Sequence, residues 1–235
     1  MTTTLITGAN KGLGFAAARR LIAAGHTVYI GCRDAERGRR AADELGARLV
    51  LLDVTDDESV AAAAKTVEDQ GGLDVLINNA GIEGRTPGGG ITSAAETTAD
   101  LMHALFETNT FGVVRVTHAF LPLLQASPAP VVVNVSSGLA SLAHVTIPET
   151  PTYAYPGVAY PASKAAVNMV TVQYAKAFPN IRINAVEPGY TATDLNHHNG
   201  IQTVEQGAEI IVRMAQVGPD GPTGGFFDAH GPIPW

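Results

Sequence analysis

Tyr160 and Lys164 lie four residues apart in a segment whose apolar residues have helical spacing. Residues at this spacing share one face of a helix, so the phenol and the ammonium can act together. A free phenol has a pKa of about 10, and a nearby positive charge lowers that pKa toward neutrality. Ser137 follows the apolar run Val131–Val135, and its hydroxyl could donate a hydrogen bond to an oxygen that the phenol protonates. These residue types predict acid–base catalysis at an oxygen atom.

The same tyrosine and lysine on an ordinary exposed helix face would do no chemistry, so the prediction of acid–base catalysis needs support from elsewhere in the chain. A metal site does not give that support. His197 and His198 are adjacent but have no companion at metal-ligand spacing, and we expect no metal site.

A glycine-rich loop near the start of the chain gives that support. The glycine at position 8 permits a tight turn, the one at 12 lets the backbone approach a phosphate, and the one at 14 allows close helix packing. A pyrophosphate would then lie at the helix N-terminus, where free N–H groups favour an anion. The loop therefore predicts dinucleotide binding, with a turn that holds no ligand as the alternative. The candidate residues are Gly8, Asn10, Lys11, Gly12, Leu13 and Gly14.

The end of the next apolar run indicates which dinucleotide is bound. It reads Cys32-Arg33-Asp34, where an NAD-binding unit would place a carboxylate for the ribose hydroxyls. Arg33 and Lys11 instead suit the 2′-phosphate of NADP, because guanidinium–phosphate pairs can be bidentate. We therefore expect NADPH/NADP+. In the alternative, both cations are solvated and Asp34 binds the ribose.

Short apolar runs alternate with helical stretches along the chain, which predicts right-handed crossovers. We expect an α/β single-domain Rossmann fold over residues 1–235, doubly wound, with a mostly seven-stranded parallel sheet and helices on both faces. Six strands can be placed: Thr4–Thr7, Thr27–Gly31, Arg48–Leu52, Val75–Asn78, Val131–Val135 and Arg182–Val186. The predicted helices are Leu13–Ala24, Ala35–Leu45, Asp57–Asp69, Ala95–Leu124 and Ala162–Phe178.

Two long connections, Glu83–Thr92 and Leu139–Val158, exceed ordinary loop lengths and suggest a lid or a substrate wall. We expect the substrate-side loops at about 139–158 and 190–203. Four aromatic residues, three of them in these loops, could line an apolar pocket or simply pack the loops. They are Tyr153, Tyr155, Tyr190 and Phe227.

Several short motifs follow one another along the chain: Thr7-Gly8-x-x-x-Gly12-x-Gly14, Asp53-Val54, Asn78-Asn79-Ala80-Gly81, Asn109, Ser136-Ser137, Tyr160-x-x-x-Lys164 and Pro188-Gly189. In this order they resemble the motifs of classical short-chain dehydrogenases/reductases from end to end. Among subfamilies, the sequences around Asn10, Cys32 and Pro188 are most similar to NADPH-dependent carbonyl reductases. The interval from Ser137 to Tyr160 is longer than in typical family tetramers and shorter than the insertion of monomeric carbonyl reductases, so a homo-oligomer and a monomer both stay open.

The resemblance implies roles for several of these residues. Asp53 and Val54 would frame the adenine, and the segment Asn79, Ala80 and Gly81 would flank the adenosine ribose. Asn78 would be structural. After Pro188 and Gly189, the backbone of Thr191 and the hydroxyl of Thr193 would hold the carboxamide and a phosphate. Lys164 would also bond the nicotinamide ribose, and Asn109 would hold a water that links the lysine to solvent.

The predicted function is hydride transfer between a nicotinamide and a small ketone, aldehyde or quinone, or the corresponding secondary alcohol. Tyr160 would act as general acid in reduction and as base in oxidation, and Ser137 would stabilise the developing negative charge. A non-catalytic NADP(H)-binding sensor or regulatory protein is the alternative. Such a protein would need the cofactor loop without the acid, so the set Asn109, Ser137, Tyr160 and Lys164 favours an enzyme.

Composition excludes other broad classes. The 235 residues carry a net charge of −7, which disfavours nucleic acid or an anionic membrane as a partner. No apolar run reaches the roughly 18 residues of a membrane helix. Cys32 is the single cysteine and fits a reducing compartment. We expect no signal segment, a cytoplasmic location and a small-molecule carbonyl or alcohol as the partner.

Overall fold

Seven parallel strands form the sheet of this protein, in the order β3-β2-β1-β4-β5-β6-β7. The structure is a computed structural model and describes residues 2–86 and 88–235. The order reverses between β1 and β4, which creates the switch point where ligands bind in such sheets. The strands are β1 (Thr3–Thr7), β2 (Thr27–Cys32), β3 (Arg48–Leu51), β4 (Val75–Asn78), β5 (Val131–Val135), β6 (Arg182–Val186) and β7 (Phe226–Phe227).

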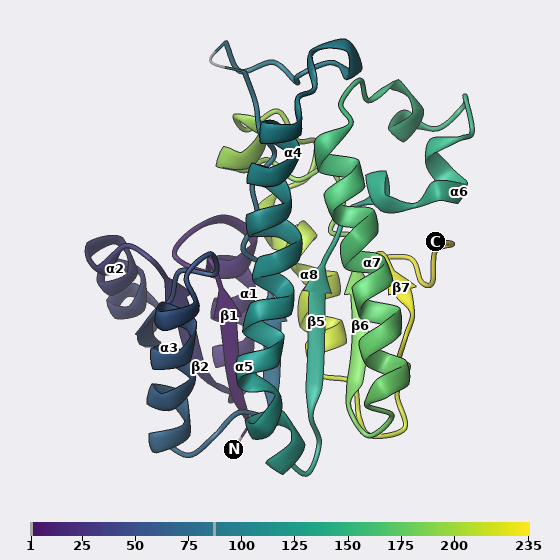
Figure 1. The fold of residues 1–235 in the computed structure, drawn as a ribbon. Helices are drawn as coiled ribbons and strands as arrows, with labels where there is room; N and C mark the ends of the chain where they lie inside the picture. The colour runs from purple at the N-terminus through teal and green to yellow at the C-terminus, as the bar shows by residue number, and fades with distance from the viewer. Residues whose placement is uncertain (1, 87) are drawn as a thin grey trace.

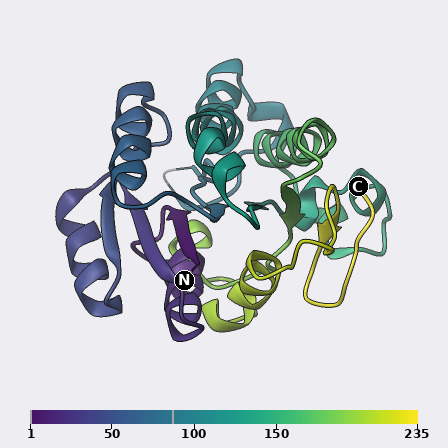
Figure 2. The ribbon, with the colours of Figure 1, turned by 90° about the horizontal axis from the view of Figure 1, so that it is seen from below.

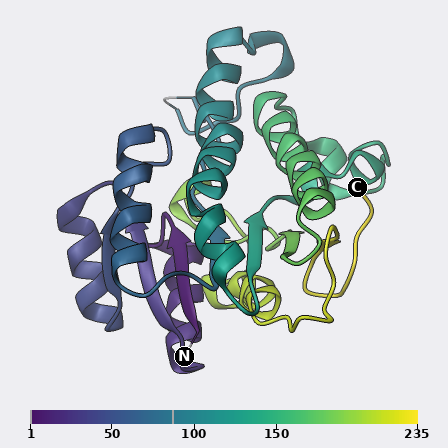
Figure 3. The same ribbon diagram turned by 60° about the horizontal axis from the view of Figure 1, so that its bottom comes forward.

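Helices cover both faces of the sheet, as predicted (Figure 1). Helices α1, α2 and α8 pack on one face of the sheet and α3, α5 and α7 on the other. The two helical layers are separated in the view from below (Figure 2) and in the oblique view (Figure 3). The helices are α1 (Gly12–Ala23), α2 (Ala35–Leu45), α3 (Asp57–Asp69), α4 (Ala99–Phe106), α5 (Gly112–Ala126), α6 (Leu142–Val145), α7 (Ala159–Ala177) and α8 (Val204–Ala215).

The central strands are apolar at successive positions because both faces of the sheet are covered. Leu5 and Ile6 are neighbours on β1, and both have no exposed side-chain surface. Side chains alternate along a strand, so Leu5 packs with α3 and α5 while Ile6 packs with α1 and α8. The continuous apolar runs in the sequence therefore correspond to a sheet buried on both faces.

The predicted helix Ala95–Leu124 begins too early and is not α-helical throughout. Its start is the 3₁₀ turn η1 (Ala94–Glu96), and a continuous helix then runs from residue 99 to residue 126 as α4, the π-helical turn η2 (Glu107–Phe111) and α5. A π-turn accommodates an extra residue in an α-helix and is frequent at functional sites. Here it buries Asn109 between α4 and α5.

The connections that follow β4, β5 and β6 lie beyond the carboxyl ends of these strands, at the top of Figure 1. Within the described residues they contain α6 and four 3₁₀ turns: η1, η3 (Gly138–Ala140), η4 (Pro151–Ala154) and η5 (Asp194–Asn196). Because parallel strands end at the same edge of a sheet, these connections share that edge with the glycine loop.

No helix within the described ranges combines the length and the apolar character needed to cross a membrane.

Candidate active site and cofactor cleft

A cleft of about 1410 Å³ runs along the carboxyl ends of the strands. Its walls come from the glycine loop, the ends of β2, β4 and β5, the start of α7, and the segment after β6. All the predicted site residues line it except Gly14 and Asn109, which lie behind its surface. The tertiary structure therefore brings motifs from the whole length of the chain into one cleft.

The glycine loop leaves the N-terminus of α1 open toward this cleft. Gly12 has a φ of +59°, a left-handed conformation that side chains other than glycine rarely adopt. Lys11 is the N-cap residue of α1 and makes no side-chain capping bond, whereas Asp34 and Asp56 cap α2 and α3. The first N–H groups of α1 are thus available for an anion, and this cradle fits a dinucleotide pyrophosphate.

Gly14 has the packing role predicted for it. A Cβ at this position would lie 2.6 Å from Asn79 Nδ2 and 2.9 Å from Ala9 Cα. Asn79 is held in turn, since its Nδ2 donates to Thr7 O at 2.8 Å and its N–H donates to Thr7 Oγ1 at 3.0 Å. The start of α1 can therefore pack against the end of β4 only if this position has no side chain.

The charged residues near β2 divide into paired and available groups. Asp34 Oδ1 accepts the N–H of Arg37 at 2.9 Å as the cap of α2, so this carboxylate already has a structural role. The Arg33 side chain is exposed at the cleft. Lys11 differs from expectation, because its Nζ lies 2.6 Å from Asp194 Oδ2 in an exposed ion pair across the cleft. Arg37 also lines the cleft, and the sequence reasoning missed it.

Asp53 and Val54 lie where the resemblance places the adenine end of the cleft. Partial burial acts to raise the pKa of Asp53, but hydrogen bonds from the Thr55 hydroxyl and N–H, helped by nearby Arg33, hold that pKa below its usual value. Asp53 is therefore a carboxylate at neutral pH and can accept a hydrogen bond.

Lys164 reaches the cleft from the first turns of α7 and is almost fully buried. Its Nζ donates to Val135 O, the last carbonyl of β5, at 2.8 Å and lies 5.8 Å from the ring centre of Tyr160. A Cβ on Gly81 would come within 3.4 Å of the same Nζ. Burial lowers the pKa of Lys164 to about 8, because the charged form is poorly solvated there.

The Tyr160 phenol lies beside Ser137, as the predicted chemistry requires. Burial and the nearby Glu83 carboxylate raise the pKa of Tyr160 above its ordinary value, Glu187 adds to the effect, and a hydrogen bond with Ser137 opposes it. This direction is opposite to the lowering expected from Lys164, because burial and the two carboxylates determine the pKa of this phenol. In the protein alone, the phenol keeps its proton at neutral pH.

Asn109 is fully buried in the π-turn and binds the backbone of a neighbouring loop. Its Oδ1 accepts the N–H of Ile82 at 2.8 Å, and its Nδ2 donates to Ile82 O at 2.9 Å and to Ser163 Oγ at 3.0 Å. This amide therefore fixes the segment after β4 against α7.

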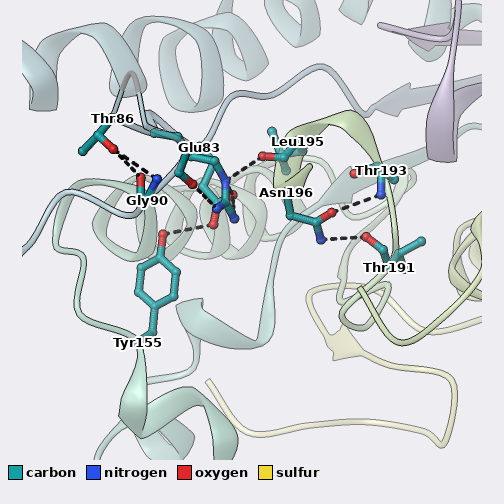
Figure 4. Close-up of polar contacts among 10 residues, drawn as sticks. Glu83, Thr86, Gly90, Tyr155, Thr191, Thr193, Leu195 and Asn196 are labelled. Atoms are coloured by element: carbon teal, nitrogen blue, oxygen red, sulfur yellow. Dashed lines mark hydrogen bonds and ion pairs between the residues drawn. The ribbon is translucent and has the colours of Figure 1, made fainter. Parts of the chain in front are cut away.

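The segment after β6 is organised by Asn196, a residue that the sequence analysis did not single out. Its Nδ2 donates to Thr191 O at 2.8 Å, and its Oδ1 accepts the N–H of Thr193 at 3.1 Å (Figure 4). Both threonines line the cleft, and the Thr193 side chain lies beside Gly12. The position of Asn196 three residues after Thr193 is a weak helix-capping pattern, the one signal that could have found it.

Other polar and aromatic residues near the cleft divide into structural residues and residues of the cleft lining. Ser136 supports the end of β5, since its Oγ donates to Asn168 Oδ1 at 2.7 Å. Ser141 is not at the cleft surface, and its Oγ donates to Pro234 O at 2.8 Å. Trp235 stacks on Phe226 with ring centres 5.5 Å apart. Of the aromatic candidates, Tyr155 and Tyr190 line the cleft while Tyr153 and Phe227 do not.

No cluster of three potential metal ligands occurs among the residues that the structure describes.

Comparisons with known proteins agree with this geometry. The family model described as short chain dehydrogenase matches residues 2–203. A short-chain dehydrogenase of Penicillium roqueforti is 37% identical over 231 residues, which covers 91% of this chain and 88% of that protein. The (+)-neomenthol dehydrogenase of Arabidopsis thaliana is 32% identical over 286 residues, covering 95% and 94%. The crystal structure of NADPH-bound carbonyl reductase from chicken fatty liver has a TM-score of 0.86 at 26% identity, covering 100% and 99%.

The sheet order and the cleft define a Rossmann-type protein built to bind a dinucleotide. With the family match over most of its length, the chain belongs to the short-chain dehydrogenase family, a family of oxidoreductases that use nicotinamide cofactors.

Proposed function

We propose that this protein is an NADPH-dependent reductase of small ketones, aldehydes or quinones, which oxidises the corresponding secondary alcohols in reverse. The observation that carries the proposal is the juxtaposition of Ser137, Tyr160 and Lys164 at one end of a cleft whose other end presents Arg33. When bound, NADPH supplies the hydride. The loops at 139–158 and 190–203 form the substrate side of the cleft in this proposal.

The protein's own groups then handle the proton and the charge. Tyr160 gives its proton to the carbonyl oxygen, a role that suits a phenol whose raised pKa keeps it protonated. Ser137 donates a hydrogen bond to the same oxygen as negative charge develops. Lys164 lies close enough to the phenol ring to stabilise the phenolate left behind, because even partial protonation adds positive charge beside it.

The preference for NADPH is supported by the charges at the end of β2. The carboxylate of Asp34 caps α2, which leaves it poorly placed to bind ribose hydroxyls as well. The exposed Arg33 is a cation at the same end, whereas the nearby Arg37 is paired with Asp34, with its Nε 3.5 Å from Asp34 Oδ2. A 2′-phosphate would therefore meet the guanidinium of Arg33 first, beside an Arg37 whose charge Asp34 already partly neutralises. The carbonyl reductase from chicken fatty liver, which has a similar fold, was crystallised with NADPH bound.

The substrate is proposed to be a largely apolar molecule. The cleft as a whole exposes more apolar than polar surface, and the carboxylates of Glu83 and Glu187 would repel an anion near the reacting oxygen. The apolar residues of its lining include Ile82, Ile91, Leu139, Pro156, Tyr190 and Ile201. We propose in addition that the enzyme works in the cytoplasm, as its single buried Cys32 suggests.

The experiment that tests this function is a screen of ketones, aldehydes and quinones for loss of NADPH absorbance, repeated with NADH. We expect turnover with NADPH, and no turnover with any carbonyl would contradict the reductase assignment. The double variant Cys32→Asp with Arg33→Ala should shift preference toward NADH by about 10-fold or more, since it replaces a phosphate partner with a ribose acceptor.

The matched control for the cofactor experiment is Arg39→Ala, an exposed arginine on α2 outside the cleft lining. It removes the same charge without touching the cofactor and should leave the NADPH-to-NADH ratio unchanged. A wild-type preference for NADH would overturn the charge argument while leaving the reductase chemistry intact.

A further inference from the structure

Glu83 is a buried carboxylate that acts on the proposed chemistry only through its charge. It lies in the loop after β4, and 9% of its side chain is exposed. One carboxylate oxygen, Oε2, accepts from Arg85 Nε at 2.8 Å and lies 2.7 Å from Arg85 Nη2. The other, Oε1, accepts the hydroxyl of Tyr155 at 3.1 Å. Both oxygens are therefore engaged within the protein, so Glu83 is not free to bind a substrate.

Arg85 extends the same network to a second loop. Its side chain is 14% exposed, and its Nε also donates to the backbone carbonyl of Leu195 at 3.0 Å, in the segment after β6. Its Nη1 donates to Gly89 O at 2.9 Å, a hydrogen bond within the loop after β4. A second hydrogen bond within this loop runs from the N–H of Thr86 to Gly90 O at 2.9 Å.

Tyr155 links a third loop to this network, because it lies at the end of the 3₁₀ turn η4 in the connection after β5 and its hydroxyl donates to Glu83. Figure 4 shows its ring rising from η4 with the hydroxyl aimed at Glu83, while Leu195 meets the network from the opposite side. The network thus joins residues that are 72 and 110 positions apart in the chain. All four of its residues line the cleft that also holds Tyr160.

We propose that Glu83 and Arg85 are positioning residues that fix the width of the substrate pocket and so determine which carbonyl compounds fit. The three loops leave three different strands, and the Glu83–Arg85 pair joins all three where they face the reacting end of the cleft. A buried ion pair is weak evidence for stability, because desolvation offsets much of its attraction, but it holds its partners in one geometry. Positioning is the role that this network can perform.

The first test replaces Tyr155 with phenylalanine, which detaches one loop and leaves the Glu83–Arg85 pair intact. We expect a KM for a small ketone that is about 2- to 10-fold higher, the range of one lost hydrogen bond, with kcat changed by less than about 2-fold. The selectivity for the small ketone over a bulky cyclic one should fall by a similar factor. Tyr153→Phe is the matched control, since Tyr153 belongs to the same turn but is exposed and outside the cleft.

The second test is the double variant Glu83→Ala with Arg85→Ala. Removing both partners leaves no buried charge unpaired, so the variant should fold. Its effect on selectivity should exceed that of Tyr155→Phe, because it detaches the loop after β6 as well. Amide hydrogen exchange should be faster at residues 88–91 and 190–203 in this variant, and unchanged in the central strands.

The kinetic readout rests on the proposed reductase function, whereas hydrogen exchange does not. If the wild-type protein reduced no carbonyl, the proposed function would fail, and the exchange rates would still decide whether the network holds the loops. Unchanged exchange in the double variant would overturn the positioning role. So would unchanged selectivity between small and bulky ketones in an active double variant.

Discussion

The two ends of the cleft present different chemical groups. At the cofactor end, the glycine loop between β1 and α1 presents backbone N–H groups, and its glycines have no side chains that would block them. At the catalytic end, side chains from β5, α7 and the long loops converge, and they meet through polar contacts such as Lys164 to Val135 and Glu83 to Tyr155. The cofactor end depends on backbone conformation, and the catalytic end depends on functional groups.

This difference determines what a substitution does. A change in the glycine loop acts through steric overlap and should disturb packing and cofactor binding together. A change at the catalytic end can remove one functional group and leave the fold intact, since the groups there come from separate elements. Three variants test this contrast.

The largest effect is expected at the catalytic end, from Tyr160→Phe. This change removes the proton donor and keeps the ring, so turnover should fall by about 10²- to 10⁴-fold while NADPH binding stays within about 2-fold. Turnover is measured by NADPH absorbance and binding by fluorescence titration. Turnover within tenfold of wild type would remove the assignment of Tyr160 as general acid.

The next effect concerns Lys164. Burial lowers the pKa of its ammonium group from 10.5 to about 8. Burial of the charged form destabilises the fold below pH 8, and this cost is relieved as the pH rises toward 10.5, because the unfolded chain then holds a proton that the folded chain has lost. Relative to Lys164→Met, the free energy of unfolding of wild type should therefore rise by up to roughly 3 kcal/mol across that window.

Urea unfolding at several pH values between about 7 and 10 measures this difference. The control is Lys176→Met, because Lys176 lies on the same helix but is exposed. The free energy of unfolding of Lys176→Met should change with pH in the same way as that of wild type, with a constant difference between the two. Parallel curves for wild type and Lys164→Met would mean that Lys164 is not desolvated in the folded protein.

The smallest of the three effects is expected at the cofactor end, from Gly14→Ala. The added Cβ would overlap Asn79 Nδ2 and Ala9 Cα, so the variant should lose about 1–3 kcal/mol of stability and bind NADPH more weakly. Gly218→Ala is the control, since a Cβ there meets nothing within 4 Å. If Gly14→Ala matched that control in both thermal unfolding and cofactor titration, the steric account of the glycine loop would be wrong.

The cofactor end was predictable because its signals are local. The turn at Gly8, the left-handed Gly12 and the close packing at Gly14 all lie within one short segment, and each glycine has a separate physical requirement. The strands β4, β5 and β6 were predicted to the residue for a similar reason, because burial on both faces makes a short strand continuously apolar. Strand β7, with two residues, is too short to give such a signal.

The catalytic end was predicted in part. The residue types Ser137, Tyr160 and Lys164 indicated the chemistry, but the direction of the pKa of Tyr160 depended on Glu83 and Glu187, which are 77 positions before and 27 positions after it in the chain. Lys11 was expected at a phosphate and pairs with Asp194. No local pattern marks such partners, because a contact between distant segments is decided only when the chain folds.

The sequence by itself was sufficient to predict the parallel sheet, from the alternation of apolar runs and helical stretches, and to single out a glycine loop and a tyrosine–lysine pair as candidates for chemistry. The tertiary structure alone decided which polar groups from distant segments meet: Glu83 with Tyr155, Arg85 with Leu195, Lys11 with Asp194, and two carboxylates with the phenol of Tyr160. The physical reason is that electrostatic energies depend on distance and burial in space, and neither can be read from positions along the chain.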